Sequence, residues 1–303
     1  MGYKIVVCAK QVPDTTNITG EAMKADGTIN RAALPAVFNP EDLNALELGL
    51  ELRDRYGGKV TVITMGPPRA ADILRDSLDR GADAVVLLTD RGFAVADTLA
   101  TSYTLAKAVE RAGGADIVLC GRQAIDGDTA QIGPQLAGRL GIGQVTYVVD
   151  VLDIADGKVT TRRMIQGGSE TVETKLPVLM TVTSEANEPR PARAKLIMKY
   201  KKAKAPCELA LELDPARKLS ADELAAKLQE KEYGLGSAGL LIAEWDGAAI
   251  AADMEQCGYV GSPTRVMKVE SALLKQMKHK SVEPTDDGLQ GLVHELVQDH
   301  ILG

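Results

Sequence analysis

Apolar and polar residues follow two different patterns along the first 140 residues. Three stretches have the helical period, at residues 39–58, 67–82 and 96–114. Around them lie four continuous apolar runs with the length of buried strands, at residues 3–9, 59–66, 83–89 and 115–120. Buried strands that alternate with helices predict a parallel sheet with helices on both faces and right-handed crossovers. The pattern therefore predicts an α/β fold.

The pattern changes after Gly143. Residues 144–175 alternate between apolar and polar positions, with turn signals at Asp156-Gly157 and Gly167-Gly168. The first of these signals is typical of a hairpin. The apolar run at 177–183 then predicts one more core strand. We expect an antiparallel addition that ends inside the main sheet.

Beyond residue 184 the periodicity weakens. Residues 190–204 contain seven Lys or Arg and no acidic residue, which predicts a solvated arm that meets an acidic protein partner. Nucleic acid is the alternative, but no interleaved aromatic residues suggest base stacking. From Cys207 onward we expect an appendage, with a capping box at Ser220 and Glu223 and a final amphipathic helix at residues 286–302.

Composition narrows the class of protein. The chain is 45% hydrophobic and 25% charged, as is ordinary for a soluble globular protein. Its net charge of −7 argues against non-specific binding of nucleic acid by the whole surface. The N-terminus lacks the architecture of a signal peptide, and no apolar stretch approaches the roughly 20 residues that span a bilayer. We expect a cytoplasmic protein with no direct membrane insertion.

Residues for metal binding or nucleophilic catalysis do not form a convincing set. The four cysteines are far apart and form no CxxC pair, so neither zinc nor a disulfide scaffold is expected. Cys8 and Cys120 each end an apolar run, where a buried, inert thiol is the usual outcome. The three histidines, His279, His294 and His300, all lie in the C-terminal region, away from the predicted sheet. We therefore name no catalytic residue.

The turn between residues 121 and 133 is the best candidate for a ligand site. None of the strand-end loops carries a G-x-G-x-x-G or a P-loop motif. A helix that starts near Thr129, with Asp128 as N-cap and Gln131 at N3, would direct its first amides at an anion. Gly127 would let the backbone approach a phosphate. Asp126 and Asp128 would repel a phosphate that they faced, so we expect them to cap amides or to accept hydroxyl protons. An ordinary capped helix start without a ligand explains the same spacing equally well.

Seven stretches of the sequence occur together and in order: VVCAKQVPDTT, FNPEDLNALELGLELRD, VTVITMGPP, ADTLATS, CGRQAIDGDTAQIGPQLA, EANEPR and GSPTRVMK. In this combination the chain resembles the β subunit of electron transfer flavoproteins. The resemblance implies an adenine-nucleotide α-hydrolase-like fold. It also implies a nucleotide-binding domain at 1–206 with a recognition arm at 185–205, and a C-terminal extension at 207–303 with a partner-contacting arm. The partner would be an FAD-carrying α subunit in a heterodimer.

The resemblance also implies an adenine-nucleotide site in this subunit. It would be built from the ends of three strands, the start of the first helix, the start of the helix at 96–114, and the loop that begins at Arg122. The residues implied are Cys8, Ala9, Asn39, Pro40, Glu41, Asp42, Met65, Gly66, Asp97, Thr98, Thr101, Arg122, Gln123, Ala124, Ile125, Asp126, Gly127, Asp128, Thr129, Ala130, Gln131, Ile132 and Gly133.

Members of the family differ in what fills that site. The stretches at VPDTT, ADTLATS and GRQAIDGDTAQIGP resemble the electron-bifurcating group, which implies FAD in this subunit, NADH as electron donor and an acyl-CoA dehydrogenase-type partner. The alternative is a single-flavin member with structural AMP, which passes electrons from acyl-CoA dehydrogenases to a quinone oxidoreductase. EANEPR is closer to that second group. A non-redox subunit that binds a nucleotide only for assembly is the remaining class.

Two stretches depart from the family pattern. The leucine with which AMP-type members dock into an acyl-CoA dehydrogenase corresponds to Ala194 here, and Leu196 is the nearest substitute. Residues 214–245 form a longer segment than is usual in the family, and no motif in it indicates a role.

Overall fold

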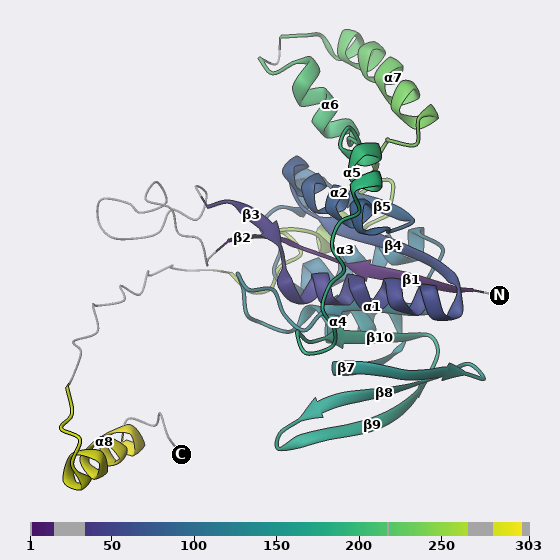
Figure 1. The fold of residues 1–303 in the computed structure, drawn as a ribbon. Helices are drawn as coiled ribbons and strands as arrows, with labels where there is room; N and C mark the ends of the chain where they lie inside the picture. The colour runs from purple at the N-terminus through teal and green to yellow at the C-terminus, as the bar shows by residue number, and fades with distance from the viewer. Residues whose placement is uncertain (1, 15–33, 217, 266–280, 299–303) are drawn as a thin grey trace.

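A central sheet organises the molecule. The computed structural model describes residues 2–14, 34–216, 218–265 and 281–298 (Figure 1). Within these ranges, nine strands form one sheet in the order β11-β5-β4-β1-β6-β10-β7-β8-β9, and β2 and β3 form a small antiparallel pair. The strands of the large sheet are β1 (Tyr3–Cys8), β4 (Gly58–Met65), β5 (Ala84–Leu88), β6 (Ile117–Gly121), β7 (Gly143–Ala155), β8 (Lys158–Ile165), β9 (Gly168–Lys175), β10 (Val178–Val182) and β11 (Ala243–Trp245).

Pairing in this sheet is mostly parallel. Every neighbour from β11 to β7 pairs in parallel, and β8 and β9 continue the sheet as an antiparallel meander. The predicted hairpin at Asp156-Gly157 is confirmed, and so is the return of the chain to the core, because β10 lies between β6 and β7. The predicted α/β class is therefore confirmed, with the antiparallel addition at one end of the sheet.

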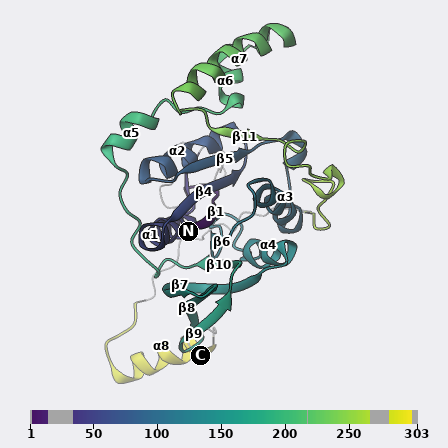
Figure 2. The same ribbon diagram turned by 90° about the vertical axis from the view of Figure 1, so that its right-hand side faces the viewer.

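Helices cover both faces of the sheet, as Figure 2 shows in a view along the strands. α1 (Pro40–Tyr56) and α2 (Ala71–Arg80) lie on one face, and α3 (Thr98–Arg111) and α4 (Ile132–Leu140) on the other. Alternate residues of the central parallel strands feed the two cores: Ile5 and Val7 of β1 join the first, while Val6 and Cys8 join the second. Strands buried on both faces explain the continuous apolar runs of the sequence.

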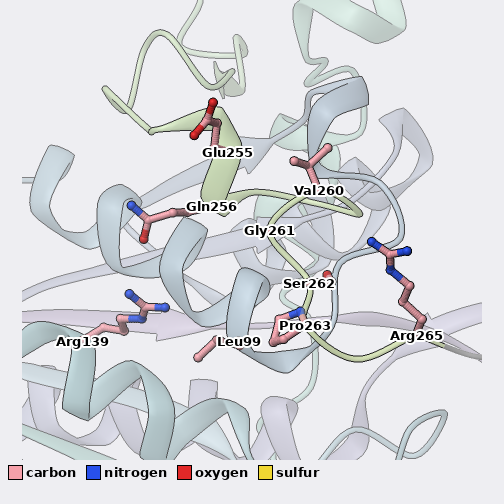
Figure 3. Close-up of a pocket in the computed structure, with 9 residues that line it drawn as sticks. All are labelled: Leu99, Arg139, Glu255, Gln256, Val260, Gly261, Ser262, Pro263 and Arg265. Carbon is pink, nitrogen blue, oxygen red and sulfur yellow. The ribbon is translucent and has the colours of Figure 1, made fainter.

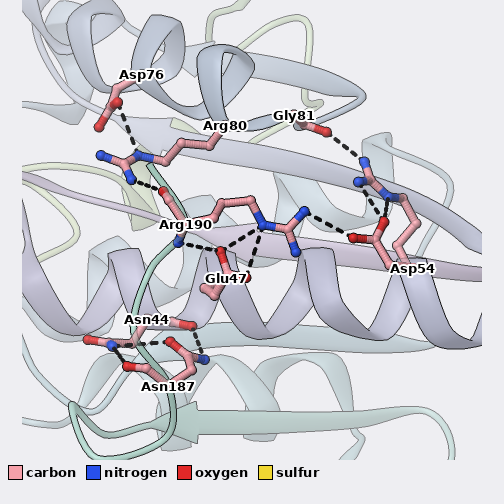
Figure 4. Close-up of polar contacts among 9 residues, drawn as sticks. Asn44, Glu47, Asp54, Asp76, Arg80, Gly81, Asn187 and Arg190 are labelled. Atoms are coloured by element: carbon pink, nitrogen blue, oxygen red, sulfur yellow. Dashed lines mark hydrogen bonds and ion pairs between the residues drawn. The ribbon is translucent and has the colours of Figure 1, made fainter. Parts of the chain in front are cut away.

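The arm at 185–205 is attached to α1 and α2 (Figure 4). Arg190 donates from its backbone N–H and its guanidinium to Glu47, and a further guanidinium N–H reaches Asp54 at 3.0 Å. Asn187 and Asn44 exchange hydrogen bonds, and Arg80 donates to the carbonyl of Arg190. The prediction of a wholly solvated basic arm is therefore wrong at Arg190, whose charge is neutralised by long-range partners that no local pattern shows.

The rest of the chain adds helices and one edge strand. The arm contains α5 (Ala194–Tyr200), and α6 (Pro206–Leu213) and α7 (Ala221–Ser237) form a hairpin above the sheet (Figure 1). The capping box of α7 at Ser220 and Glu223 is confirmed. The remaining elements are β2 (Gln11–Pro13), β3 (Ala36–Phe38), three 3₁₀ turns (Pro68–Ala70, Arg91–Phe93 and Met254–Gln256) and α8 (Asp286–Gln298). Among the described residues no helix is long and apolar enough to cross a membrane.

Some sequence predictions lie outside the described residues. These are His279, His300, the last four residues of the expected final helix, and the ends of the VVCAKQVPDTT and GSPTRVMK motifs.

The start of α4 packs closely on the sheet, which predicts a stability effect at Gly133. A Cβ there would lie 2.4 Å from Cγ2 of Thr181 and 3.1 Å from Sγ of Cys120. Thr181 cannot move freely, because its hydroxyl oxygen accepts a hydrogen bond from the N–H of Tyr147. We expect Gly133→Ala to lower the free energy of unfolding by about 1–3 kcal/mol, as overpacking does. Urea denaturation measures this change.

Gly138 supplies the matched control in the same helix. A Cβ at Gly138 meets no atom within 4 Å, so Gly138→Ala should be neutral or stabilising by up to about 1 kcal/mol. Equal effects of the two substitutions would show that helix propensity, and not packing on the sheet, governs Gly133.

Candidate functional site

A cavity lies where the strand order reverses. β1 and β6 run side by side, with Cys8 opposite Cys120, yet the chain passes through β4 and β5 on the other side of β1 between them. In open parallel sheets, ligands bind at the carboxyl ends of strands beside such a switch point. The cavity there has a volume of about 880 Å³.

The lining contains most of the residues that the sequence predicted. Those that line the cavity are Cys8, Ala9, Asp42, Met65, Gly66, Asp97, Thr98, Thr101, Arg122, Gln123, Ala124, Gly127, Asp128, Thr129, Ala130, Gln131 and Ile132. Six predicted residues do not line it: Asn39, Pro40, Glu41, Ile125, Asp126 and Gly133. The sequence reasoning missed the remaining lining residues, among them Lys10, Asp90, Arg91, Phe93, Val95, Cys120, Gly121 and Thr264.

The carboxylate of Asp42 joins the two strand ends at the switch point. One oxygen accepts the N–H of Lys10, just after β1, at 2.9 Å, and the other accepts the N–H of Gly121, the last residue of β6, at 2.8 Å. Gly121 has to be glycine here, because a Cβ would lie 2.6 Å from the carboxylate oxygen. Burial raises the pKa of Asp42 to about 7, although the two backbone donors oppose that shift.

The start of α1 also holds the loop that follows β6. Glu41 accepts the N–H of Gln123 at 2.9 Å and pairs with the guanidinium of Arg122 at 3.0 Å. Asn39 donates to the carbonyl of Gln123 and accepts the N–H of Ile125. Asn39 and Glu41 therefore lie behind the loop and fix its path. These two residues therefore support the cavity wall without lining the cavity.

The predicted cap of α4 is wrong. The helix begins at Ile132, its N-cap is Gln131, and Asp128 and Ala130 adopt left-handed φ values of 50° and 53°. A start at Ile132 places Pro134 in the first turn, where its missing N–H costs no hydrogen bond. Asp128 instead accepts from the side chain of Gln123 at 3.1 Å.

Asp126, beside Gly127, does not line the cavity, and its carboxylate pairs with the ammonium group of Lys10 at 2.7 Å, where an amide or hydroxyl donor was expected. A Cβ at Gly127 would meet no protein atom within 4 Å. Gly127 faces the cavity, so only a ligand would contact a side chain placed there.

Residues 89–98 form one rim of the cavity. Asp97 is the N-cap of α3, and its carboxylate accepts the N–H of Ala100 at 3.0 Å. The hydroxyl of Thr98 donates to the side-chain oxygen of Gln131 at 2.8 Å. This bond links the beginning of α3 to the beginning of α4 across the cavity.

The cavity has a polar end and an apolar end. Over β1 and β6, the lining contains Lys10 and most of the loop 122–131, including Arg122. Over β4 and β5, the apolar part of the lining is Met65, Pro67, Pro68, Leu88, Phe93 and Leu105, and Thr89, Asp90 and Arg91 follow β5 there. Such a cavity suits an elongated ligand with an anionic group at one end and a flat apolar ring at the other.

Thiol chemistry is absent from this site. Burial raises the pKa of Cys8 to about 12 and raises that of Cys120 as well. A thiol that stays protonated is a poor nucleophile and a poor metal ligand. Within the described ranges no group of His, Cys, Asp and Glu could hold a metal ion. Any redox chemistry at this site would need a bound cofactor.

The raised pKa of Asp42 predicts a pH-dependent stability. Between its ordinary pKa of 3.8 and the folded value of about 7, the folded chain keeps a proton that the unfolded chain has lost. The free energy of unfolding should therefore fall as pH rises from about 4 to about 7, by at most about 1.4 kcal/mol per pH unit from this group. Urea unfolding at a series of pH values measures the slope.

Asp42→Asn is the comparison, since an amide does not titrate. The variant should lack this component of the pH dependence, while its lost acceptor lowers stability at every pH. Parallel curves for the two proteins would contradict the assignment.

Comparison with known proteins agrees with this geometry. Residues 26–206 match the electron transfer flavoprotein domain. The chain is 39% identical over 298 residues to the electron transfer flavoprotein subunit beta of Clostridium acetobutylicum, an alignment that covers 98% of this chain and 99% of the relative. It is also 39% identical to protein FixA of Bradyrhizobium diazoefficiens, with 95% and 89% covered.

A further relative aligns over fewer residues but with a higher sequence identity. The caffeyl-CoA reductase-Etf complex subunit CarD of Acetobacterium woodii is 48% identical over 188 residues, which cover 62% of this chain and 71% of the relative. The family model, the near full-length relatives and the cavity at the switch point agree. The chain belongs to the family of electron transfer flavoprotein β subunits and FixA proteins.

Proposed function

We propose that the cavity binds FAD and that this subunit takes electrons from NADH, as in flavin-based electron bifurcation. The observation that carries the proposal is the reach of the cavity, which extends from the loop 122–131 to the apolar wall over β4 and β5 and the rim at 89–98. FAD contains all of AMP together with a second phosphate, a ribityl chain and an isoalloxazine ring. AMP alone would leave one end of this cavity unfilled.

The residues of the cavity fit that cofactor. At the polar end Lys10 and Arg122 neutralise the carboxylates of Asp126 and Glu41, and the open space at Gly127 lets the backbone approach a pyrophosphate. Phe93, Leu88 and Met65 supply apolar contacts at the other end. Bound flavin would supply the redox chemistry, while the residues of this chain bind and orient it. The likeness to CarD, a subunit named for an Etf complex with caffeyl-CoA reductase, supports this proposal.

The experiment is a nucleotide count with an NADH titration. The purified complex with its α subunit should contain two FAD per heterodimer, and NADH should bleach flavin absorbance within minutes, whereas NADPH should do so poorly. One FAD with one AMP, and no bleaching by NADH, would establish the single-flavin alternative, in which AMP is structural and a quinone oxidoreductase receives the electrons. A nucleotide-bound complex without redox activity would point to an assembly role.

Gly127→Val provides the variant for the same experiment. Its φ lies outside the left-handed region and its Cβ meets no protein atom, so the sheet should fold normally. We expect substoichiometric nucleotide after gel filtration, because the new side chain would meet only the ligand. Full occupancy in this variant would remove the loop from the binding site.

We propose two partner surfaces on separate helices. Leu289, Val293 and Val297 are exposed on α8 at a spacing of four residues, which forms an unpartnered apolar stripe suited to the α subunit.

On α5, Leu196 is half-buried and Met198 is 65% exposed, so Met198 is better placed than Leu196 for an acyl-CoA dehydrogenase-type partner. Lys195 and Lys199 add positive charge around it.

The two surfaces predict separable defects. Truncation after Pro284 should reduce co-purification of the α subunit, while far-UV circular dichroism of the sheet domain persists. Met198→Glu should leave the αβ complex intact but slow electron exchange with the dehydrogenase, because a buried acid at an apolar contact is unfavourable. An undiminished αβ yield after truncation would show that α8 is not an assembly element, and unchanged exchange rates would remove Met198 from the contact.

A further inference from the structure

One residue on the cavity rim has an unusual backbone. Val95 has a φ of 59°, in the left-handed region that a β-branched side chain rarely adopts. It lines the cavity and is also 78% exposed. Strained residues persist only where the surroundings fix them, and they concentrate at binding sites.

A distant segment supplies that constraint on both sides of Val95. We call residues 257–264 the rim strap. On one side, the N–H of Tyr259 donates to the carbonyl of Ala94 at 3.0 Å. On the other, the N–H of Asp97 donates to the hydroxyl of Ser262 at 2.8 Å.

Thr264 completes the attachment of the rim strap. Its N–H and its hydroxyl both donate to one carboxylate oxygen of Asp97, at 3.1 Å and 2.6 Å. The other oxygen of Asp97 caps α3 at the N–H of Ala100. Gly258 packs so closely on the rim that a Cβ would lie 2.0 Å from the carbonyl oxygen of Gly92. The backbone on both sides of Val95 therefore has little freedom to relax its strained conformation.

The rim strap separates two hollows. Thr264 lines the main cavity, whereas its neighbours Gly261, Ser262, Pro263 and Arg265 line a second hollow of about 550 Å³, together with Leu99 and Arg139 (Figure 3). Val95 lines only the main cavity, with Phe93 and Leu88. The strained residue thus adds an apolar side chain to the end of the cavity that suits a ring.

We propose that the rim strap holds Val95 in its strained conformation so that its side chain packs against the ring system of the bound dinucleotide, which makes Val95 a ligand contact and Thr264 a positioning residue. This inference rests on the proposed binding of FAD and adds a residue that selects FAD over AMP. AMP occupies the polar end and does not reach the rim. Val95 and Thr264 therefore affect FAD much more than AMP.

The test measures binding of FAD and of AMP, each as a separate probe, to the nucleotide-stripped αβ complex. Val95→Ala should weaken FAD binding by about tenfold, the effect of two buried methyl groups, and change AMP binding by less than about twofold. Leu152→Ala is the control for loss of an exposed apolar side chain, because Leu152 is 41% exposed on β7 and does not line the main cavity. Its affinity for FAD should equal that of the wild type.

Thr264→Val tests the positioning role. It keeps the backbone donor to Asp97 but loses the hydroxyl, so FAD affinity and the visible circular dichroism of the bound flavin should both change, while thermal stability and AMP affinity do not. Thr264→Ser should restore both. If neither Val95→Ala nor Thr264→Val changed the affinity for FAD, the inference would be overturned. Equal losses of affinity for FAD and for AMP would also overturn it. A wild-type complex that binds no FAD at this site would instead overturn the proposed function and, with it, this inference.

Discussion

The buried carboxylate of Asp42 is the interaction on which the site depends. Its two oxygens accept the backbone N–H groups of Lys10 and Gly121, one from each strand at the switch point. Because α1 packs across β1 and β6, the same helix that fills the core also sets the distance between the two loops. Without that carboxylate, two buried N–H groups would lose their acceptors and both walls of the cavity would be free to move.

The acidic residues of the loop after β6 no longer conflict with an anion site. Asp126 is neutralised by Lys10, Asp128 accepts from Gln123, and Glu41 is paired with Arg122 from behind. Each carboxylate thus has a donor other than a ligand. The space at Gly127 remains open, so an acidic sequence can still surround a phosphate.

Short-range sequence patterns predicted the helices and strands whose positions depend on residues close together in the chain. The strands β1, β4, β5 and β6 and the helices α1, α2 and α3 follow from continuous apolar runs and helical period, whereas the short strands β2 and β3 were not predicted. The start of α4 was misplaced because Asp128 resembles an N-cap, whereas the helix begins at Ile132 and has Pro134 in its first turn. The attachment of Arg190 to Glu47 and of Thr264 to Asp97 joins residues more than 140 positions apart, and such pairs leave no periodic signal.

The C-terminal region completes the cavity rather than standing apart from it. β11 adds to the edge of the sheet beside β5, and the N–H of Thr89 donates to the carbonyl of Trp245. The chain then follows the rim, with Gly247 donating to Asp90 and the rim strap bonding to Asp97. Residues on both sides of position 206 therefore build one site.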